Sequence, residues 1–471
     1  MRLLLVPVLV AGLTACDVSH RLVTSPTETG RQFAALPADA EQRWPEPDWW
    51  RAFGSDELDG LIHEVASDNL DLQAAAQRVV QAEAQTRISR AALFPSIDAD
   101  AGVSRGRSSS NSQNRTRTSY SGSIAASYEL DLAGGLRDLA EASQLRLLGS
   151  SFDRDALGLI LTADTADAYF TLLALRDRLA LARDTLEASR RVLGIVRVQA
   201  AAGQASDLEV QQQLSAVSSQ EAAVAEFEGD AQRQANALAT LLGRPPGELA
   251  VATAGLSALT LPPVIAGLPS ELLRRRPDLV QAEAELAAAG YDAQAARAAR
   301  FPIVALTASG GLQSDELGDL LRLDQAVWSL AGAAITPVFD AGRLEANEDQ
   351  AVARFQELAA SYSQAILNAL QDVDDSLVLV ETARRSFALR QAAYRAASEA
   401  YRIAELRWRT GAADFLSVLQ AQQASISAAD TLTQADLARF TASVSLYRAL
   451  GGGWDAAPAE PLLARVQARA P

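Results

Sequence analysis

The same unit occurs twice along this chain, and that repeat constrains the fold more than any other feature. Compared with itself, the 471-residue sequence aligns first at a shift of 207 residues and then, further along, at a shift of 208. The aligned pairs are Phe94-Pro95 with Phe301-Pro302, Gly134 with Gly342, Gly203 with Gly411, and Leu242-Gly243 with Leu450-Gly451. A duplicated unit predicts one elongated architecture built twice, and not two or three unrelated domains.

Each copy begins with a predicted helix and later contains a much longer one. The first helices are expected over residues 56–93 and 270–300, and each ends at a Phe-Pro pair because proline does not continue a helix. Residues 135–202 and 343–410 contain no proline. At about 1.5 Å per residue, each of these two stretches predicts a helix roughly 100 Å long.

The long stretches carry the spacing of coiled coils. Apolar residues recur in alternate steps of three and four from Leu172 to Val196, and the same phase recurs from Val380 to Ala404. Gly203 and Gly411 follow these stretches, and glycine ends a helix easily because it adopts positive φ. We therefore expect two helical hairpins, whose second arms are residues 206–242 and 414–450.

Four segments alternate apolar and polar residues with the period of a β-strand, about ten residues each. They lie in two predicted β-hairpins, 96–132 and 303–338, each directly after a Phe-Pro pair. Residues 105–119 consist of serine, asparagine, glutamine, threonine, arginine and glycine. Alone this stretch fits a disordered linker, but its flanking strands favour a solvent-exposed loop outside a membrane.

Strands that enter a membrane must form a closed sheet, since an open edge in lipid leaves backbone groups without hydrogen bonds. Four strands cannot close alone, so several chains must share one barrel. Two chains give about eight strands, which side chains fill, and three give about twelve, which leaves a passage. The sequence therefore predicts a mainly α chain with a small β part, and a homotrimer with a shared 12-stranded barrel above a helical tube.

The N-terminus carries a secretion signal. Arg2 precedes an apolar run over residues 3–13 that is too short to span a bilayer, which predicts a signal peptide over residues 1–15. Leu13-Thr14-Ala15-Cys16 resembles a bacterial lipobox, so Cys16 is the predicted lipid anchor of an N-terminal segment covering 16–55. The alternative is cleavage after Ala15 with an incidental cysteine. Asp17 resembles an inner-membrane retention signal, which a barrel would override.

Composition excludes several functions. With 42 basic and 58 acidic residues, the net charge of −16 disfavours a nucleic-acid partner. Cys16 is the single cysteine and His20 and His63 the only histidines, so disulfide frameworks and Cys/His zinc sites are excluded, and no cofactor is expected beyond the lipid. No Ser/His/Asp set indicates an enzyme. A soluble coiled-coil adaptor or scaffold is the rival class, although the paired strands argue against it.

One motif and the order of elements resemble a known family. Leu272-Leu273-Arg274-Arg275-Arg276-Pro277-Asp278, followed by Ala282-Glu283, is similar to a signature of the lipoprotein, NodT-like branch of TolC-like outer-membrane factors. The resemblance implies repeats over 56–243 and 270–451, and a periplasmic α-helical tunnel below the barrel. It also implies an equatorial region made from 244–269 and the termini, including the tail 452–471.

The same resemblance implies a function. Such a chain is a lipid-anchored channel in the outer membrane, through which a resistance-nodulation-division pump in the inner membrane, linked by a periplasmic adaptor, discharges drugs. A type I protein-secretion partner is the nearer alternative, and glycolipid, metal and drug exporters all remain open. By motif position the resemblance identifies a candidate periplasmic gate at Glu209, Trp408, Asp414 and Gln420.

Adaptor contact is implied at the two hairpin tips, by Gly203, Ser206 and Asp207 in the first and by Gly411 and Ala412 in the second. Gln420 occupies the position where many members carry a gate aspartate, so either a Gln420 ring or the nearby Asp414 is the candidate latch. For Glu209, Trp408 and Gln420, the competing interpretation is ordinary surface at a helix end.

Overall fold

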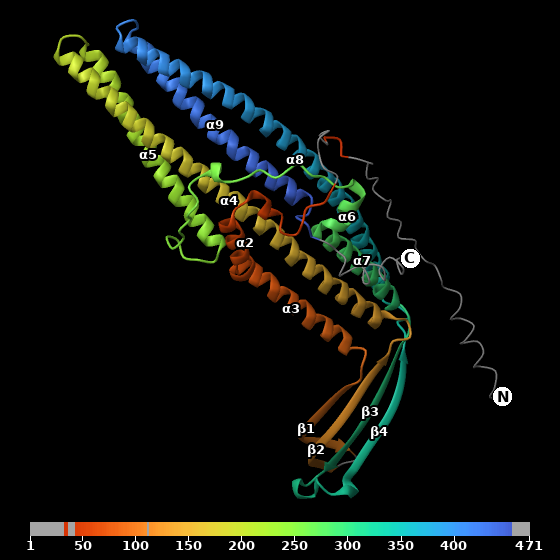
Figure 1. The fold of residues 1–471 in the computed structure, drawn as a ribbon. Coiled ribbons are helices and arrows are strands. Elements are labelled where there is room, and N and C mark those ends of the chain that lie inside the picture. The colour runs from red at the N-terminus through yellow and green to blue at the C-terminus, as the bar shows by residue number, and fades with distance from the viewer. Residues whose placement is uncertain (1–32, 36–42, 111–112, 455–471) are drawn as a thin grey trace.

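Helices and strands lie at opposite ends of the molecule (Figure 1). The computed structural model describes residues 33–35, 43–110 and 113–454. Cys16, Asp17, His20 and the predicted signal peptide lie outside the described residues, as does most of the tail. The prediction of a mainly α chain with a small β part is confirmed.

The chain order repeats helix, strand pair and long helical hairpin. The α-helices are α2 (Asp56–Asp68), α3 (Leu70–Ala91), α4 (Gly135–Ala201), α5 (Asp207–Leu241), α6 (Leu272–Arg275), α7 (Pro277–Ala298), α8 (Arg343–Arg409) and α9 (Phe415–Ala449). The strands are β1 (Ser96–Ser110), β2 (Gln113–Leu130), β3 (Ile303–Ser314) and β4 (Ala326–Ile335).

The two long helices match their prediction closely. The stretches 135–202 and 343–410 form α4 and α8, each of 67 residues, which at about 1.5 Å per residue gives roughly 100 Å. Each pairs with a 35-residue partner, α5 or α9, to form a hairpin. By length and composition α4 contains a stretch that could cross a membrane, but 44% of it is buried within the chain.

Each predicted first helix is divided in two, which corrects the expectation of unbroken helices. Between α2 and α3, Asn69 has an extended backbone with φ −62° and ψ 127°. Its buried side chain accepts a hydrogen bond from the Leu72 amide at 3.0 Å, which caps α3. It also donates one to the Leu241 carbonyl at 2.8 Å, so the break docks the first helices on the end of α5.

The second repeat has the same break at the aligned residue, Arg276. Its backbone is also extended, with φ −113° and ψ 117°, and it separates α6 from α7. The Arg276 guanidinium, 14% exposed, bonds Asp278 at 2.7 Å and Asp372 of α8 at 2.9 Å. The Arg-Arg-Pro-Asp run thus anchors the start of α7 on α8.

The strands form one antiparallel sheet in the order β1-β2-β3-β4. The loop predicted over residues 105–119 is wrong, because β1 and β2 stay paired out to Ser110 and Gln113. Serine, threonine and arginine can continue a strand beyond the apolar band of a barrel, since the backbone ladder needs no apolar side chain. The strands are therefore up to 18 residues long, and not about ten.

An aromatic core lies where α2, α4 and α9 meet the segments that flank them. Phe53 and Phe170 are fully buried, with ring centroids 4.8 Å apart, and Phe440 packs 5.1 Å from Phe170. Trp49 stacks on Tyr447 at 5.0 Å and 11°. Residues on both sides of the inter-repeat boundary therefore share one core, here called the belt.

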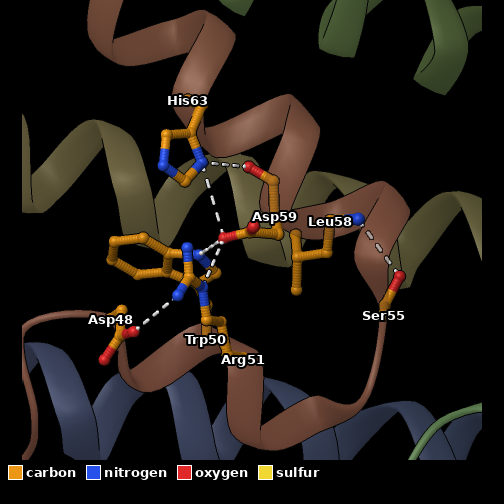
Figure 2. A network of polar contacts seen from close by, with 7 residues as sticks. All are labelled: Asp48, Trp50, Arg51, Ser55, Leu58, Asp59 and His63. Atoms are coloured by element: carbon orange, nitrogen blue, oxygen red, sulfur yellow. Dashed lines mark hydrogen bonds and ion pairs between the residues drawn. The ribbon is translucent and has the colours of Figure 1, made fainter.

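A polar network fixes the entry to α2 (Figure 2). Asp59 accepts hydrogen bonds from Trp50 Nε1 at 2.8 Å and Arg51 Nε at 2.9 Å, and these bonds lower the pKa of its carboxyl, with the Arg51 bond contributing most. His63 Nδ1 lies 2.7 Å from the Asp59 carbonyl oxygen. Ser55 caps the helix by accepting from the Leu58 amide at 3.1 Å. These contacts hold the segment that carries Trp49 and Phe53 of the belt against α2.

Candidate channel wall and hairpin tips

The strand registers place apolar side chains from all four strands on one face of the sheet. Ile124 lies opposite Ala99 on one side and Gly310 on the other, and Gly310 lies opposite Trp328. The exposed large apolar side chains of this face are Ile97, Val103, Ile124, Leu306, Trp328 and Leu330. A continuous, exposed apolar face is typical of the lipid side of a membrane barrel.

The opposite face is mainly polar on β1 and β2 and mixed on β3 and β4, where serines alternate along the strands with residues such as Ile303, Val327 and Ile335. Ser96 and Ser127 hydroxyls lie 2.8 Å apart across β1 and β2. Ser309 and Ser329 hydroxyls lie 2.9 Å apart across β3 and β4. Hydroxyl pairs of this kind fit the water-filled interior of a barrel, which is lined by polar side chains.

In the described part of the chain, β1 pairs only with β2 and β4 only with β3, so both outer strands have a free edge. Free edges expose backbone donors and acceptors that lipid cannot satisfy. A sheet of this kind is complete in a membrane only when further strands close it.

Both hairpin tips use the same turn. Gly203 and Gly411 have φ of +72° and +73°. In the first tip, the Gly203 amide donates to the Ala200 carbonyl at 2.9 Å, and the Gln204 amide donates to the Gln199 carbonyl at 2.8 Å. The second tip has the equivalent pair of bonds. This is the Schellman geometry that ends helices at glycine, so both glycines lie at the turns expected of them.

Glu209 and Ser206 form a capping box at the start of α5. The Glu209 amide donates to Ser206 Oγ at 3.3 Å, and the Ser206 amide donates back to Glu209 Oε2 at 2.6 Å. The Glu209 carboxylate is therefore engaged within its own helix end.

Asp414 is the N-cap of α9, the position that Ser206 has in α5. Its Oδ1 accepts from the Ser417 amide at 2.8 Å and from the Ser417 hydroxyl at 2.5 Å. Ser417, mainly through its hydroxyl, holds the pKa of the exposed Asp414 carboxyl below its usual value. Asp414 is thus an ionised N-cap, and Asp207 and Ala412 are exposed beside the two turns.

Trp408 and Phe415 join the two tips. Their ring centroids lie 5.4 Å apart across the second turn. Phe415 is 2% exposed because it packs on Val192 and Val196 of α4, in the first hairpin. The two tips of one chain are therefore packed against each other.

Gln420 is exposed, whereas Gln422 is buried at the contact between the two hairpins. Gln422 Nε2 donates to Ser189 Oγ at 3.1 Å, and Gln213 Nε2 donates to the Ser189 carbonyl at 2.9 Å. Gln213 Oε1 is buried and has no hydrogen-bond partner in the described part of the chain. Sequence reasoning missed this polar layer, although Ser189 breaks an apolar heptad series and could have indicated it.

An ion pair joins the hairpins farther from the tips. Arg178 of α4 contacts Asp430 of α9 through Nε at 2.6 Å and Nη2 at 3.3 Å. The same guanidinium lies 4.4 Å above the Phe227 ring of α5. Arg178 therefore links three helices.

Asp167 is the most perturbed carboxyl described near the belt. Burial, opposed by Arg448 and assisted by Asp164, raises its pKa to about 7. Its Oδ1 is buried and has no hydrogen-bond partner in the described part of the chain. The physical cause is desolvation of the charged form.

The chain resembles curated proteins over nearly its whole length. It is 37% identical over 451 residues to the pyoverdine export outer membrane protein OpmQ of Pseudomonas aeruginosa, which covers 94% of this chain and 95% of the relative. It is 35% identical over 415 residues to the toluene efflux pump outer membrane protein TtgC of Pseudomonas putida, covering 87% and 86%. The cation efflux system protein CusC of Escherichia coli is 30% identical over 459 residues, covering 96% and 98%.

Solved structures share the fold. The outer-membrane channel OprN superposes with a TM-score of 0.86 at 28% identity, over 92% of this chain and 99% of that one. The open-state MtrE outer membrane channel of Neisseria gonorrhoeae gives 0.82 at 32% identity, over 92% and 97%. The family model described as outer membrane efflux protein matches residues 61–244 and 268–452. These ranges include both strand pairs and both helical hairpins, so the chain belongs to the outer membrane efflux protein family.

Proposed function

We propose that three copies of this chain form a passive, lipid-anchored exit duct, gated at the hairpin tips, for a multidrug pump of the resistance-nodulation-division class. The observation that carries the proposal is the sheet, with one apolar face, an opposite face that carries paired serine hydroxyls, and two free edges. Three such sheets supply the roughly twelve strands that leave a water-filled passage. The roughly 100 Å helices α4 and α8 then form the wall of a periplasmic tunnel.

The proposed gate comprises Glu209, Trp408, Asp414 and Gln420. Trp408 holds the second tip against the first through Phe415. The capping roles of Glu209 and Asp414 set the direction in which α5 and α9 leave the tips, so these two residues would position the gate. Gln420, which is exposed, is the residue left to meet a neighbouring copy.

The proposed adaptor contact comprises Gly203, Ser206, Asp207, Gly411 and Ala412. These residues are exposed at the end of the molecule farthest from the sheet, where a partner in the periplasm would meet them (Figure 1).

The proposed lipid on Cys16 would hold the chain at the membrane while the barrel assembles. Incorporation of labelled palmitate, lost in Cys16→Ala, tests that anchor.

Electron microscopy of the detergent-purified protein tests the duct. The expected particle is a threefold tube well over 100 Å long, the helices lying beneath a barrel. A monomer, or a thin rod without a barrel, would overturn the proposal.

The choice of a drug pump is tested by deleting the gene. Greater sensitivity to dyes, detergents and antibiotics is expected. Unchanged sensitivity together with the loss of a secreted protein would favour a type I secretion partner. The names of the relatives above refer to pyoverdine export, toluene efflux and cation efflux, so panels of each kind belong in the assay.

A further inference from the structure

The β1–β2 hairpin continues beyond the rest of the sheet as a two-stranded ribbon, in which residues 104–110 pair with 113–119. β3 ends at Ser314 opposite Tyr120, so this part of β2 pairs only with β1. The ribbon lies at the end of the sheet away from the helices (Figure 1). The helical tunnel of this family lies in the periplasm, so the ribbon is at the cell-exterior end of the sheet.

The ribbon is basic in an acidic chain. Residues 105–119 contain four arginines and no aspartate or glutamate, whereas the whole chain has a net charge of −16. The arginines are Arg105, Arg107, Arg115 and Arg117. A local group of cations in a negative molecule attracts anions to this end of the sheet.

The strand register separates the outward-facing arginines from the rest. Side chains alternate along a strand, so Arg105 and Arg107 share the apolar face with Val103 on β1. Arg117 of β2 lies opposite Gly106, on the other face. Val103 is the last large apolar residue of β1. Two arginines therefore continue the apolar row of β1 directly beyond its end.

The arginines of the two faces differ in their partners. Arg117 bonds Asp315 through two nitrogens, with Nε 2.7 Å from Oδ1 and Nη2 2.7 Å from Oδ2. Arg105 and Arg107 are exposed, and in the described part of the chain no ion pair or hydrogen bond joins either guanidinium to another side chain. Their charges are therefore available to a partner outside the chain.

The position of these two arginines matches the boundary of a lipid layer. At about 3.3 Å per residue, Arg105 lies roughly 7 Å and Arg107 roughly 13 Å beyond Val103 along β1. An arginine stem can lie along apolar surface while its guanidinium extends into the polar layer above. The guanidinium also binds phosphate through two parallel hydrogen bonds, which suits the phosphates of lipid head groups.

We propose that Arg105 and Arg107 bind the phosphate groups of lipids in the outer leaflet of the outer membrane. The ligand class is a phosphorylated lipid, whose head group lies at the ribbon while its acyl chains cover the apolar face below. The inference rests on the proposed barrel and adds a specific lipid contact on its outer side. This contact sets the height of the barrel in the membrane.

Lipid binding to the detergent-purified full chain tests the site. Native mass spectrometry measures how much lipid A, which carries two phosphates, the threefold particle retains. Arg105→Gln should weaken retention roughly fivefold and Arg105→Gln/Arg107→Gln roughly thirtyfold, the factors expected for one and two cations at an anionic surface. Arg117→Gln removes one charge from the other face of the ribbon, and should retain lipid A like the wild type.

Two further measurements separate phosphate recognition from a general effect on folding. Arg105→Lys/Arg107→Lys keeps both charges and should retain most of the binding, because lysine also binds phosphate, although as a point charge. Lipid A stripped of its phosphates should bind the wild type and Arg105→Gln/Arg107→Gln equally.

The outcomes distinguish this site from the duct. Equal retention of lipid A by the wild type and Arg105→Gln/Arg107→Gln, in particles that microscopy shows to be threefold, would overturn the site and leave the duct intact. Unchanged retention with a lower melting temperature in lipid-free detergent would assign the two arginines to contacts between copies instead. If no threefold particles form, the duct fails and this site fails with it.

Discussion

Arg178 on α4 and Asp430 on α9 form a two-point ion pair that joins the first helical hairpin to the second. The Arg178 side chain is 24% exposed and the Asp430 side chain 29%. Gln434 Nε2 adds a hydrogen bond to Asp430 Oδ2 at 2.6 Å. Along α4, the pair lies well before the tip turn at Gly203. It therefore resists separation of the two hairpins.

Replacing Asp430 with Asn should weaken that restraint. Leaving the half-buried guanidinium without its carboxylate should cost about 1–3 kcal/mol. We expect cells carrying Asp430→Asn to admit large antibiotics that the outer membrane normally excludes, measured as a lower inhibitory concentration. Arg191→Gln removes an exposed pair with Glu187 on the same helix and serves as the control. Equal leakage from both variants would remove any special role for Arg178.

Phe415 should be required to keep the tips of one chain together. Phe415→Ala empties a buried site beside Val192 and Val196 and should destabilise the tip contact by about 3 kcal/mol. The neighbouring Leu416→Ala alters a 49% exposed side chain and should change little. Cleavage at the tips by a soluble protease measures the difference, with faster cutting expected only for Phe415→Ala. Equal rates for the two variants would show that the tips do not depend on this ring.

Asp167 should make stability depend on pH. Its pKa is raised to about 7 by burial, so the folded protein binds a proton that the unfolded chain has already released. The stability this proton provides is complete below the ordinary aspartate pKa of about 4 and is lost as pH rises towards 7. The wild type should melt at a lower temperature at pH 8 than at pH 5. Asp167→Asn should flatten that difference, and an unchanged pH profile in the variant would refute the assignment.

Adjacent residues of β4 should respond oppositely to charge. Leu330 lies on the apolar face, so Leu330→Arg places a cation towards lipid and should cost about 2–4 kcal/mol. Ser329 lies on the opposite face, beside Ser309, so Ser329→Arg should fold normally and alter ion selectivity in planar bilayers. Heat-modifiability on gels measures folding. A stable Leu330→Arg with an unfolded Ser329→Arg would reverse the assignment of the faces.

Much of this fold was predictable because the repeat and the heptads act over long distances. The ends of α4 and α8 fell within one residue of prediction, since Gly203 and Gly411 terminate them by a purely local mechanism. The break at Asn69 was missed because the residue pattern there suits a helix, and a tertiary bond to Leu241 supports the extended residue. The parts of β1 and β2 beyond residue 105 were missed because the alternation of apolar and polar residues ends there, whereas the strands continue.

The candidate site was less predictable for a related reason. Motif position indicated Gln420, yet Gln422 is the buried glutamine that reaches Ser189. Which of two neighbouring polar residues turns inward depends on how α9 is rotated against α4, and a single sequence does not contain that angle. The gate roles of Glu209, Trp408, Asp414 and Gln420 stay predictions.

The unbroken length of α4 has a mechanical consequence. From Asp167 at the belt to its end at Ala201, the helix extends about 50 Å at 1.5 Å per residue. A rod of that length turns each degree of tilt at the belt into roughly 0.9 Å of sideways travel at the tip. A tilt of a few degrees, set by the packing of Phe53, Phe170 and Phe440, would therefore move the hairpin tips sideways by several ångströms.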